Sequence, residues 1–145
     1  MKGRVSAELI FKLMVVIIIV IGILYFMSYL LGKMNVKASI DAQYSHIEEV
    51  EDKAKDLRET GGEIVSYPFK LEPYTKCIWF NQSEKALMVL FKTASNPVLI
   101  KVESYWDIGL EKSKAKLNTP GHIYKLRITP SVISCEDCFE EGCED

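Results

Sequence analysis

The sequence predicts an α+β chain in which a long N-terminal transmembrane helix is followed by a small antiparallel β-sandwich-like domain. Residues 13–31 form an uninterrupted apolar run without a charged side chain. An apolar stripe at helical spacing then continues over residues 36–57. After Gly62 the spacing changes to the alternation of apolar and polar residues that is typical of half-buried strands.

The 145 residues leave room for one compact domain after the helix. The net charge is −2 and the charges are mixed, so the composition gives no basic surface for nucleic acid. Four segments follow from these patterns: a signal/transmembrane helix at 1–31, a juxtamembrane amphipathic helix continuing it at 32–60, an extracytoplasmic β domain at 61–134, and an acidic cysteine-containing tail at 135–145.

The apolar run is long enough to cross a bilayer as a helix. Its nineteen residues span about 28 Å, close to the thickness of the hydrocarbon layer. A cleavable secretory signal has a shorter apolar region that ends in a small-x-small site. Gly32-Lys33-Met34-Asn35 follows here instead, so we expect the run to be retained and membrane lipid to be its partner.

The helix is predicted to continue from about Ser6 to about Glu59. Helix-forming residues dominate this stretch, and the first proline is Pro68. Gly61-Gly62 is a typical helix end. A membrane helix with a separate short helix hinged at Gly32 is an open alternative.

Seven strands are predicted beyond the helix, and turn-forming residues separate several of them. Tyr124, Leu126 and Ile128 alternate with Lys125 and Arg127, which is typical of an antiparallel sheet with one buried face. The aromatic residues of this region are expected to form its core. The predicted strands are 63–71, 75–80, 85–92, 98–106, 113–117, 123–129 and 132–135.

The four cysteines all lie after the apolar run, at Cys77, Cys135, Cys138 and Cys143. We favour disulfides over a metal site, because the neighbouring carboxylates oppose thiolate formation and Cys77 has no paired half-site. Three connectivities are open; we expect Cys77 to join the final predicted strand, with a second small loop inside the tail. No metal and no cofactor is expected.

Three features favour a cytoplasmic N-terminus and a C-terminal domain outside the cell membrane. The even number of cysteines suits an oxidising compartment. Asn81-Gln82-Ser83 is a glycosylation sequon on the same side. Basic residues are also slightly more frequent before the apolar run than just after it. The basic residues compared are Lys2, Arg4 and Lys12 against Lys33 and Lys37.

The first residues carry a further pattern. Lys2-Gly3 is followed by Arg4, and Ser6, Glu8 and Leu9 then precede the apolar run. This resembles the class III signal of archaeal type IV pilin-like proteins, which has a basic-Gly junction followed by Q-x-S-x-E-[FL]. The resemblance implies that a prepilin peptidase cuts after Gly3, and that Arg4, standing where glutamine is usual, becomes the new N-terminus.

The same resemblance implies a structural role, as a subunit of a homo-oligomer or an extracellular filament. Glu8 would neutralise the N-terminus of a neighbouring subunit in the filament core. In the family the position of Lys12 is normally apolar, because a buried ammonium is costly. Lys12 therefore departs from the family pattern. Its i, i+4 spacing after Glu8 is favourable for an ion pair on the helix.

Two other hypotheses belong to different classes. One is an uncleaved single-pass protein whose β domain binds a partner or scaffolds a complex. The other is a thiol or metal module that uses Cys135, Cys138 and Cys143. His46 and His122 have no nucleophile or carboxylate at a recognisable spacing, so no catalytic residue is assigned and an enzyme is not expected. His122 is expected to be a surface turn residue.

Overall fold

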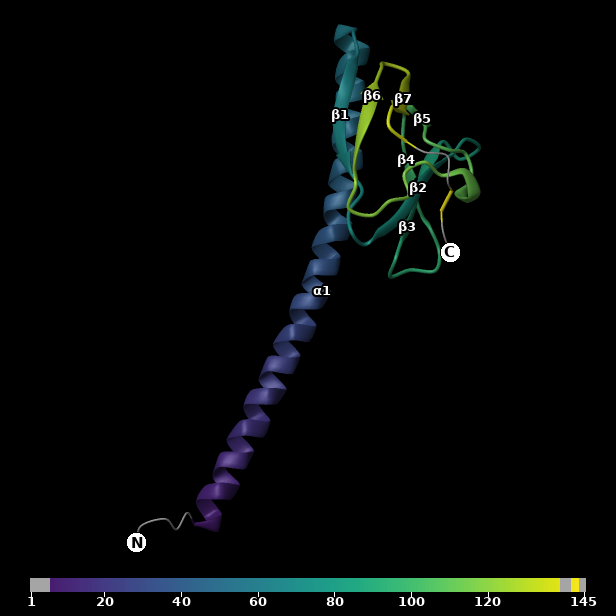
Figure 1. Ribbon diagram of the computed structural model, residues 1–145. Coiled ribbons are helices and arrows are strands. Elements are labelled where there is room, and N and C mark those ends of the chain that lie inside the picture. The colour runs from purple at the N-terminus through teal and green to yellow at the C-terminus, as the bar shows by residue number, and fades with distance from the viewer. Residues whose placement is uncertain (1–5, 139–141, 144–145) are drawn as a thin grey trace. The chain divides into compact units, whose positions relative to one another are not determined.

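The computed structural model describes residues 6–138, 142 and 143, which fall into two compact units, Met1–Lys37 and Ala38–Asp145. Helix α1, Ala7–Thr60, contributes to both (Figure 1). It runs through Gly32, so the chain is helical where the alternative placed a hinge. The predicted helix and the α+β class are therefore confirmed. We refer to Ala38–Asp145 as the β unit.

Helix α1 ends at two glycines that follow its last residue. Gly61 and Gly62 have φ angles of +75° and +96°, which side chains with a Cβ rarely adopt. The backbone N–H of Gly61 donates to the carbonyl of Leu57 at 2.7 Å, which caps the last turn.

The described strands of the β unit form two sheets. The four-stranded sheet has the order β1-β6-β7-β5 and the three-stranded sheet the order β2-β3-β4. All pairs are antiparallel except β5 with β7. The strands are β1 (Ile64–Lys70), β2 (Thr75–Asn81), β3 (Ala86–Phe91), β4 (Val98–Lys101), β5 (Tyr105–Asp107), β6 (Ile123–Ile128) and β7 (Val132–Cys135).

Two predicted strands are wrong. Residues 98–106 form β4 and β5, which belong to different sheets, because the chain leaves the small sheet after Lys101 and enters the large one at Tyr105. Residues 113–117 begin within the 3₁₀ turn η1 (Lys112–Lys114), and Leu117 makes a single bridge to Ile78. The parallel β5–β7 pair also departs from the antiparallel prediction; β6 lies between them in the chain, so the connection is long enough to allow it.

One hydrophobic core is shared by α1 and both sheets. The helix contributes Ile47, Val50 and Ala54, all at most 2% exposed. Strand β6 has the predicted alternation, with Tyr124, Leu126 and Ile128 buried. Most of the aromatic residues that the sequence places in the core are also found there. Phe69, Phe80, Phe91 and Trp106 are buried there and Tyr67 and Tyr105 partly buried, while Trp79 packs separately with Cys77, Leu90 and Ala115.

Polar side chains of α1 also dock the helix within the β unit. Buried Gln43 accepts hydrogen bonds through Oε1 from the Glu72 N–H at 2.8 Å and the Thr75 hydroxyl at 2.9 Å. Glu51 Oε1 accepts from the Trp106 indole N–H at 2.6 Å. The apolar stripe predicted from the sequence omitted Gln43, because a glutamine is usually exposed unless other polar groups satisfy it.

Tyr67 gives the β unit a testable pH dependence. Partial burial, then the charge of Glu49, then the 3.2 Å hydrogen bond from the phenol to Glu49 raise the Tyr67 pKa. A raised native pKa means that the folded state holds this proton more tightly than the unfolded state does. Stability from this residue is therefore complete below pH 10, the ordinary value, and is lost as the pH rises through the native pKa.

The urea concentration at the unfolding midpoint, measured in detergent, should fall between pH 9 and about 11 in the wild type. We expect this fall to be smaller in Tyr67→Phe. Glu49→Gln should shift the Tyr67 pKa back only in part, because burial is its largest cause. A wild-type midpoint that falls no faster than that of Tyr67→Phe would contradict this assignment.

Candidate functional site

The first candidate site is the apolar part of α1 in the N-terminal unit. All residues over 9–31 are exposed, and the exposed fractions of the large hydrophobic ones run from 38% for Val15 to 77% for Tyr25. The most apolar 18-residue window has a mean hydropathy of 2.9 and none of it is buried. The helix is thus long and apolar enough to cross a membrane, and its apolar surface is uncovered within the described part of the chain.

Polar residues begin this helix. Ser6 caps it, since its Oγ accepts the backbone N–H of Leu9 at 3.1 Å. Glu8 lies in the first turn, where a negative charge is favourable, and its Oε1 is 3.1 Å from Lys12 Nζ. Both side chains are more than two-thirds exposed. Gly3 and Arg4, the predicted processing residues, lie outside the described residues.

The second candidate site is the disulfide-bonded end of the β unit. The disulfides are Cys77–Cys143 and Cys135–Cys138. The preference for disulfides therefore agrees with the structure, but the expected connectivity is wrong: Cys77 joins the tail rather than the final strand, and the small loop includes Cys135.

Backbone contacts explain this pairing. Cys135 ends β7 opposite Leu126 in the large sheet, whereas Cys77 lies on β2 in the small one. Cys143 is held by η1, because its backbone N–H donates to the Lys112 carbonyl at 3.0 Å. The disulfide then joins this part of the tail to β2. Asn118 Nδ2 donates to the Gly142 carbonyl at 2.6 Å beside it. Sequence spacing cannot reveal such long-range contacts.

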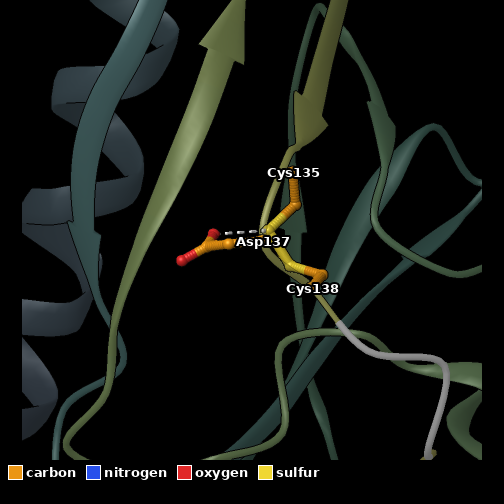
Figure 2. Close-up of side chains that lie close together, drawn as sticks. All are labelled: Cys135, Asp137 and Cys138. Carbon is orange, nitrogen blue, oxygen red and sulfur yellow. Dashed lines mark hydrogen bonds between the residues drawn. A yellow bond between two sulfur atoms is a disulfide. The ribbon is translucent and has the colours of Figure 1, made fainter.

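Cys135, Asp137 and Cys138 bring three potential metal-ligand atoms within 4.8 Å of one another (Figure 2). Both sulfur atoms are used in the disulfide, and zinc binds thiolates. The cluster therefore offers a metal one carboxylate while the disulfide is closed. Asp137 Oδ1 lies 3.7 Å from Cys135 Sγ. The sulfur has a hydrogen to donate to this oxygen only if the disulfide is reduced.

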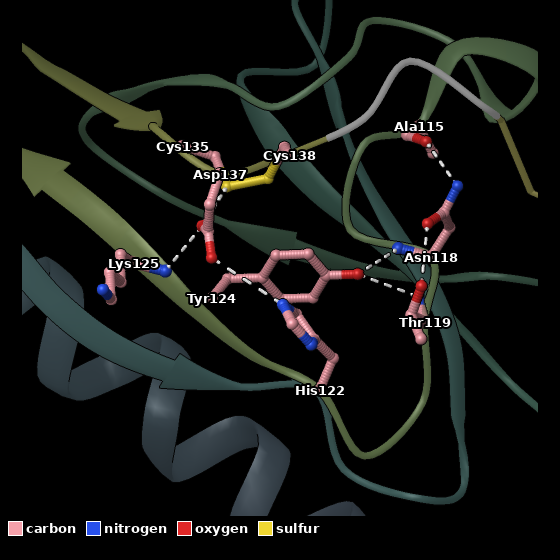
Figure 3. Close-up of a disulfide and its surroundings, with 9 residues drawn as sticks. All are labelled: Ala115, Asn118, Thr119, His122, Tyr124, Lys125, Cys135, Asp137 and Cys138. Atoms are coloured by element: carbon pink, nitrogen blue, oxygen red, sulfur yellow. Dashed lines mark hydrogen bonds and ion pairs between the residues drawn. A yellow bond between two sulfur atoms is a disulfide. The ribbon is translucent and has the colours of Figure 1, made fainter.

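Asp137 instead fastens the turn after β7 to β6 (Figure 3). Its Oδ1 accepts the Lys125 N–H at 2.9 Å, and its Oδ2 is 3.7 Å from His122 Nε2. The His122 ring packs edge-on to Tyr124, with ring centres 4.5 Å apart. Tyr124 in turn accepts N–H bonds from Asn118 and Thr119. His122 is exposed at a turn, as predicted.

Both histidines have carboxylate partners that sequence spacing missed. His46 Nε2 lies 2.8 Å from Glu72 Oε1, 26 residues away in the chain, and His122 faces Asp137. His46 connects α1 to the turn before β2 and also packs edge-on to Phe69. These pairs join different elements of the fold. No sequence spacing indicates them, because the partners are far apart in the chain.

The sequon residue Asn81 lies at the end of β2, the strand that also carries Cys77. It begins the turn that connects β2 to β3, and the four turn residues after it are exposed.

The fold and these sites define a class of chain: an apolar N-terminal helical segment able to cross a membrane, followed by a disulfide-bonded unit of one helix and two sheets. No family model, curated protein or solved structure matches this chain.

Proposed function

We propose that this protein is a non-enzymatic, membrane-anchored structural subunit of the type IV pilin-like kind, with its β unit outside the cell. A prepilin peptidase removes Met1 to Gly3, and the apolar part of α1 then anchors the subunit in the membrane or in the core of a filament. The β unit forms the exposed surface.

The observation that carries this proposal is the fully uncovered apolar surface of residues 9–31. A helix that is apolar on all sides needs lipid or other apolar helices around it. Glu8 and Ser6 stand at its start, where the sequence resembles a class III signal. The later part of α1 packs in the core of the β unit, so one element serves both for anchoring and for folding.

Glu8 gives the assembly a specific polar contact. Processing after Gly3 would leave the amino group of Arg4 two residues before the Ser6 cap. A neighbouring subunit's Glu8 can neutralise that charge where the surroundings are apolar. Glu8 is exposed and has two carboxylate oxygens. It can therefore bind Lys12 and a second amino group at the same time.

A second candidate is an uncleaved single-pass protein whose β unit binds a partner. The Glu8–Lys12 ion pair favours it, because Glu8 then has a cation within its own helix and needs none from a neighbour. Such a pair also suits the headgroup layer, where both side chains reach water.

Intact mass and N-terminal sequencing distinguish these functions. The full chain is isolated from membranes of its native host, or of cells that carry an archaeal prepilin peptidase. We expect the chain to begin at Arg4, and Gly3→Glu to leave it unprocessed. Gly22→Ala is the matched control, since a Cβ at Gly22 meets nothing within 4 Å.

A wild-type chain that still begins at Met1 or Lys2 would reject the pilin-like subunit and leave the single-pass protein. Glu8→Gln tests the next step: it should be processed normally but yield fewer filaments in a sheared surface fraction, because its carboxamide cannot neutralise an amino group.

A further inference from the structure

We propose that Asn81 is the acceptor of an N-linked oligosaccharide, through its side-chain nitrogen Nδ2. This inference rests on the orientation in the proposed function, which puts the β unit on the side where such transfer occurs. It concerns the hairpin that joins β2 to β3, which lies outside the apolar part of α1.

The sequon lies at the tip of a two-stranded hairpin. Asn81 pairs with Ala86 as the last rung of the β2–β3 ladder. The turn between them closes with the Lys85 N–H on the Gln82 carbonyl, and Lys85 has a φ of +48°. All four residues of this turn are exposed, and Asn81 is partly exposed. An oligosaccharide at this tip would extend into solvent.

Hydrogen bonds fix the orientation of the Asn81 amide. Its Oδ1 accepts the Ser83 N–H at 3.1 Å, the Ser83 hydroxyl at 2.8 Å and the Glu84 N–H at 3.2 Å. Two of these donors are backbone N–H groups, which require an oxygen opposite them. Nδ2 therefore points away from the turn and has no hydrogen-bond partner among the described residues.

This arrangement makes the modification compatible with the fold. The turn uses only Oδ1, and a sugar on Nδ2 leaves that oxygen free to accept the same three bonds. Asn118 provides the contrast, since its Nδ2 donates to the carbonyls of Ala115 and Gly142 at 3.2 and 2.6 Å. A sugar on Asn118 would break contacts that hold the tail, and Asn118-Thr119-Pro120 is not a sequon.

The co-reactant is an oligosaccharide joined through diphosphate to a polyprenyl lipid. Asn81 Nδ2 attacks the anomeric carbon of the first sugar, and a nitrogen–carbon bond forms. The bond from that carbon to the diphosphate oxygen breaks, and its electron pair leaves with the lipid diphosphate. One amide proton passes to a base of the transferase. The Ser83 hydroxyl, which donates to Oδ1, is the group that the sequon requires two residues on.

Translation of the full chain with endoplasmic-reticulum microsomes tests this inference, because the microsomes supply both transferase and lipid-linked oligosaccharide. We expect the wild type to gain one oligosaccharide that peptide N-glycosidase removes. Asn81→Gln and Ser83→Ala should lose it completely, whereas Ser83→Thr should keep it. A double variant, Asn81→Gln with Thr93→Asn, moves the sequon to the exposed turn between β3 and β4.

The moved sequon separates the two possible failures. If the double variant is modified and the wild type is not, the β unit reaches the transferase and Asn81 is not an acceptor, so this inference is overturned while the orientation stands. If neither chain is modified, both this inference and the outward orientation are overturned. N-terminal processing is measured separately and is not affected by either outcome.

Discussion

Replacing Cys77 and Cys143 together with alanine is expected to lower the free energy of unfolding of the β unit by about 4 kcal/mol. This disulfide closes a loop with a sequence separation of 66 residues, so its loss restores much entropy to the unfolded chain. Cys77 is also completely buried against Trp79 and Leu90, where the smaller side chain leaves space unfilled.

The second disulfide is the matched control. Cys135 and Cys138 have a sequence separation of only 3, and both are only partly buried. Hydrogen bonds from Glu136 N–H to the Lys125 carbonyl and from Lys125 N–H to Asp137 already hold this turn. Replacing both cysteines with alanine should therefore cost about 2 kcal/mol.

Urea unfolding of the full chain in nonionic detergent, followed by the fluorescence of Trp79 and Trp106, measures both changes. Trp79 lies in the cluster around Cys77, whereas Trp106 lies in the main core. Equal losses for the two double variants would contradict the dependence on loop length and burial.

Replacing Gln43 with leucine is expected to cost about 3 kcal/mol, although the two side chains are similar in size. Gln43 is fully buried, and its Oε1 is the acceptor for the Glu72 N–H and the Thr75 hydroxyl. Leucine removes the acceptor and leaves two donors without a partner in a place that water does not reach.

A second substitution makes the cause measurable. Thr75→Val in the Gln43→Leu background removes one of the two orphaned donors and should recover about 1 kcal/mol. Gln82→Leu, in the exposed turn after β2, is the control and should change the unfolding midpoint little. Gln43→Leu with no loss of stability would show that the Gln43 contacts do not dock α1 in the β unit.

Patterns that depend on near neighbours in the chain predict the structure correctly. The sequence predicts a helix over 6–59 and the structure has one at Ala7–Thr60, because apolar spacing, helix-forming residues and Gly61-Gly62 are all local features. Strands β6 and β7 were also found at their predicted places, since their alternation and the flanking turns are local.

Contacts between distant residues were the ones that sequence reasoning missed. The stretch 98–106 is predicted as one strand, yet it divides between two sheets, and at the break Glu51 and Arg58 on α1 bind residues 103 and 104. Ser104 is buried there and donates toward Glu51, a partner 53 residues away. No alternation pattern contains that information.

The sequence by itself determined the apolar helix, its continuation to Gly61, the α+β class and the positions of the thiols and of the sequon. Each depends on residue type and spacing, and so on forces that act within a few turns or a few strand residues. Only the tertiary structure decided which cysteines pair, which carboxylates face His46 and His122, and which amide atom of Asn81 is left unused. Those outcomes depend on how the helix and two sheets close around one core, which brings together residues that the sequence keeps far apart.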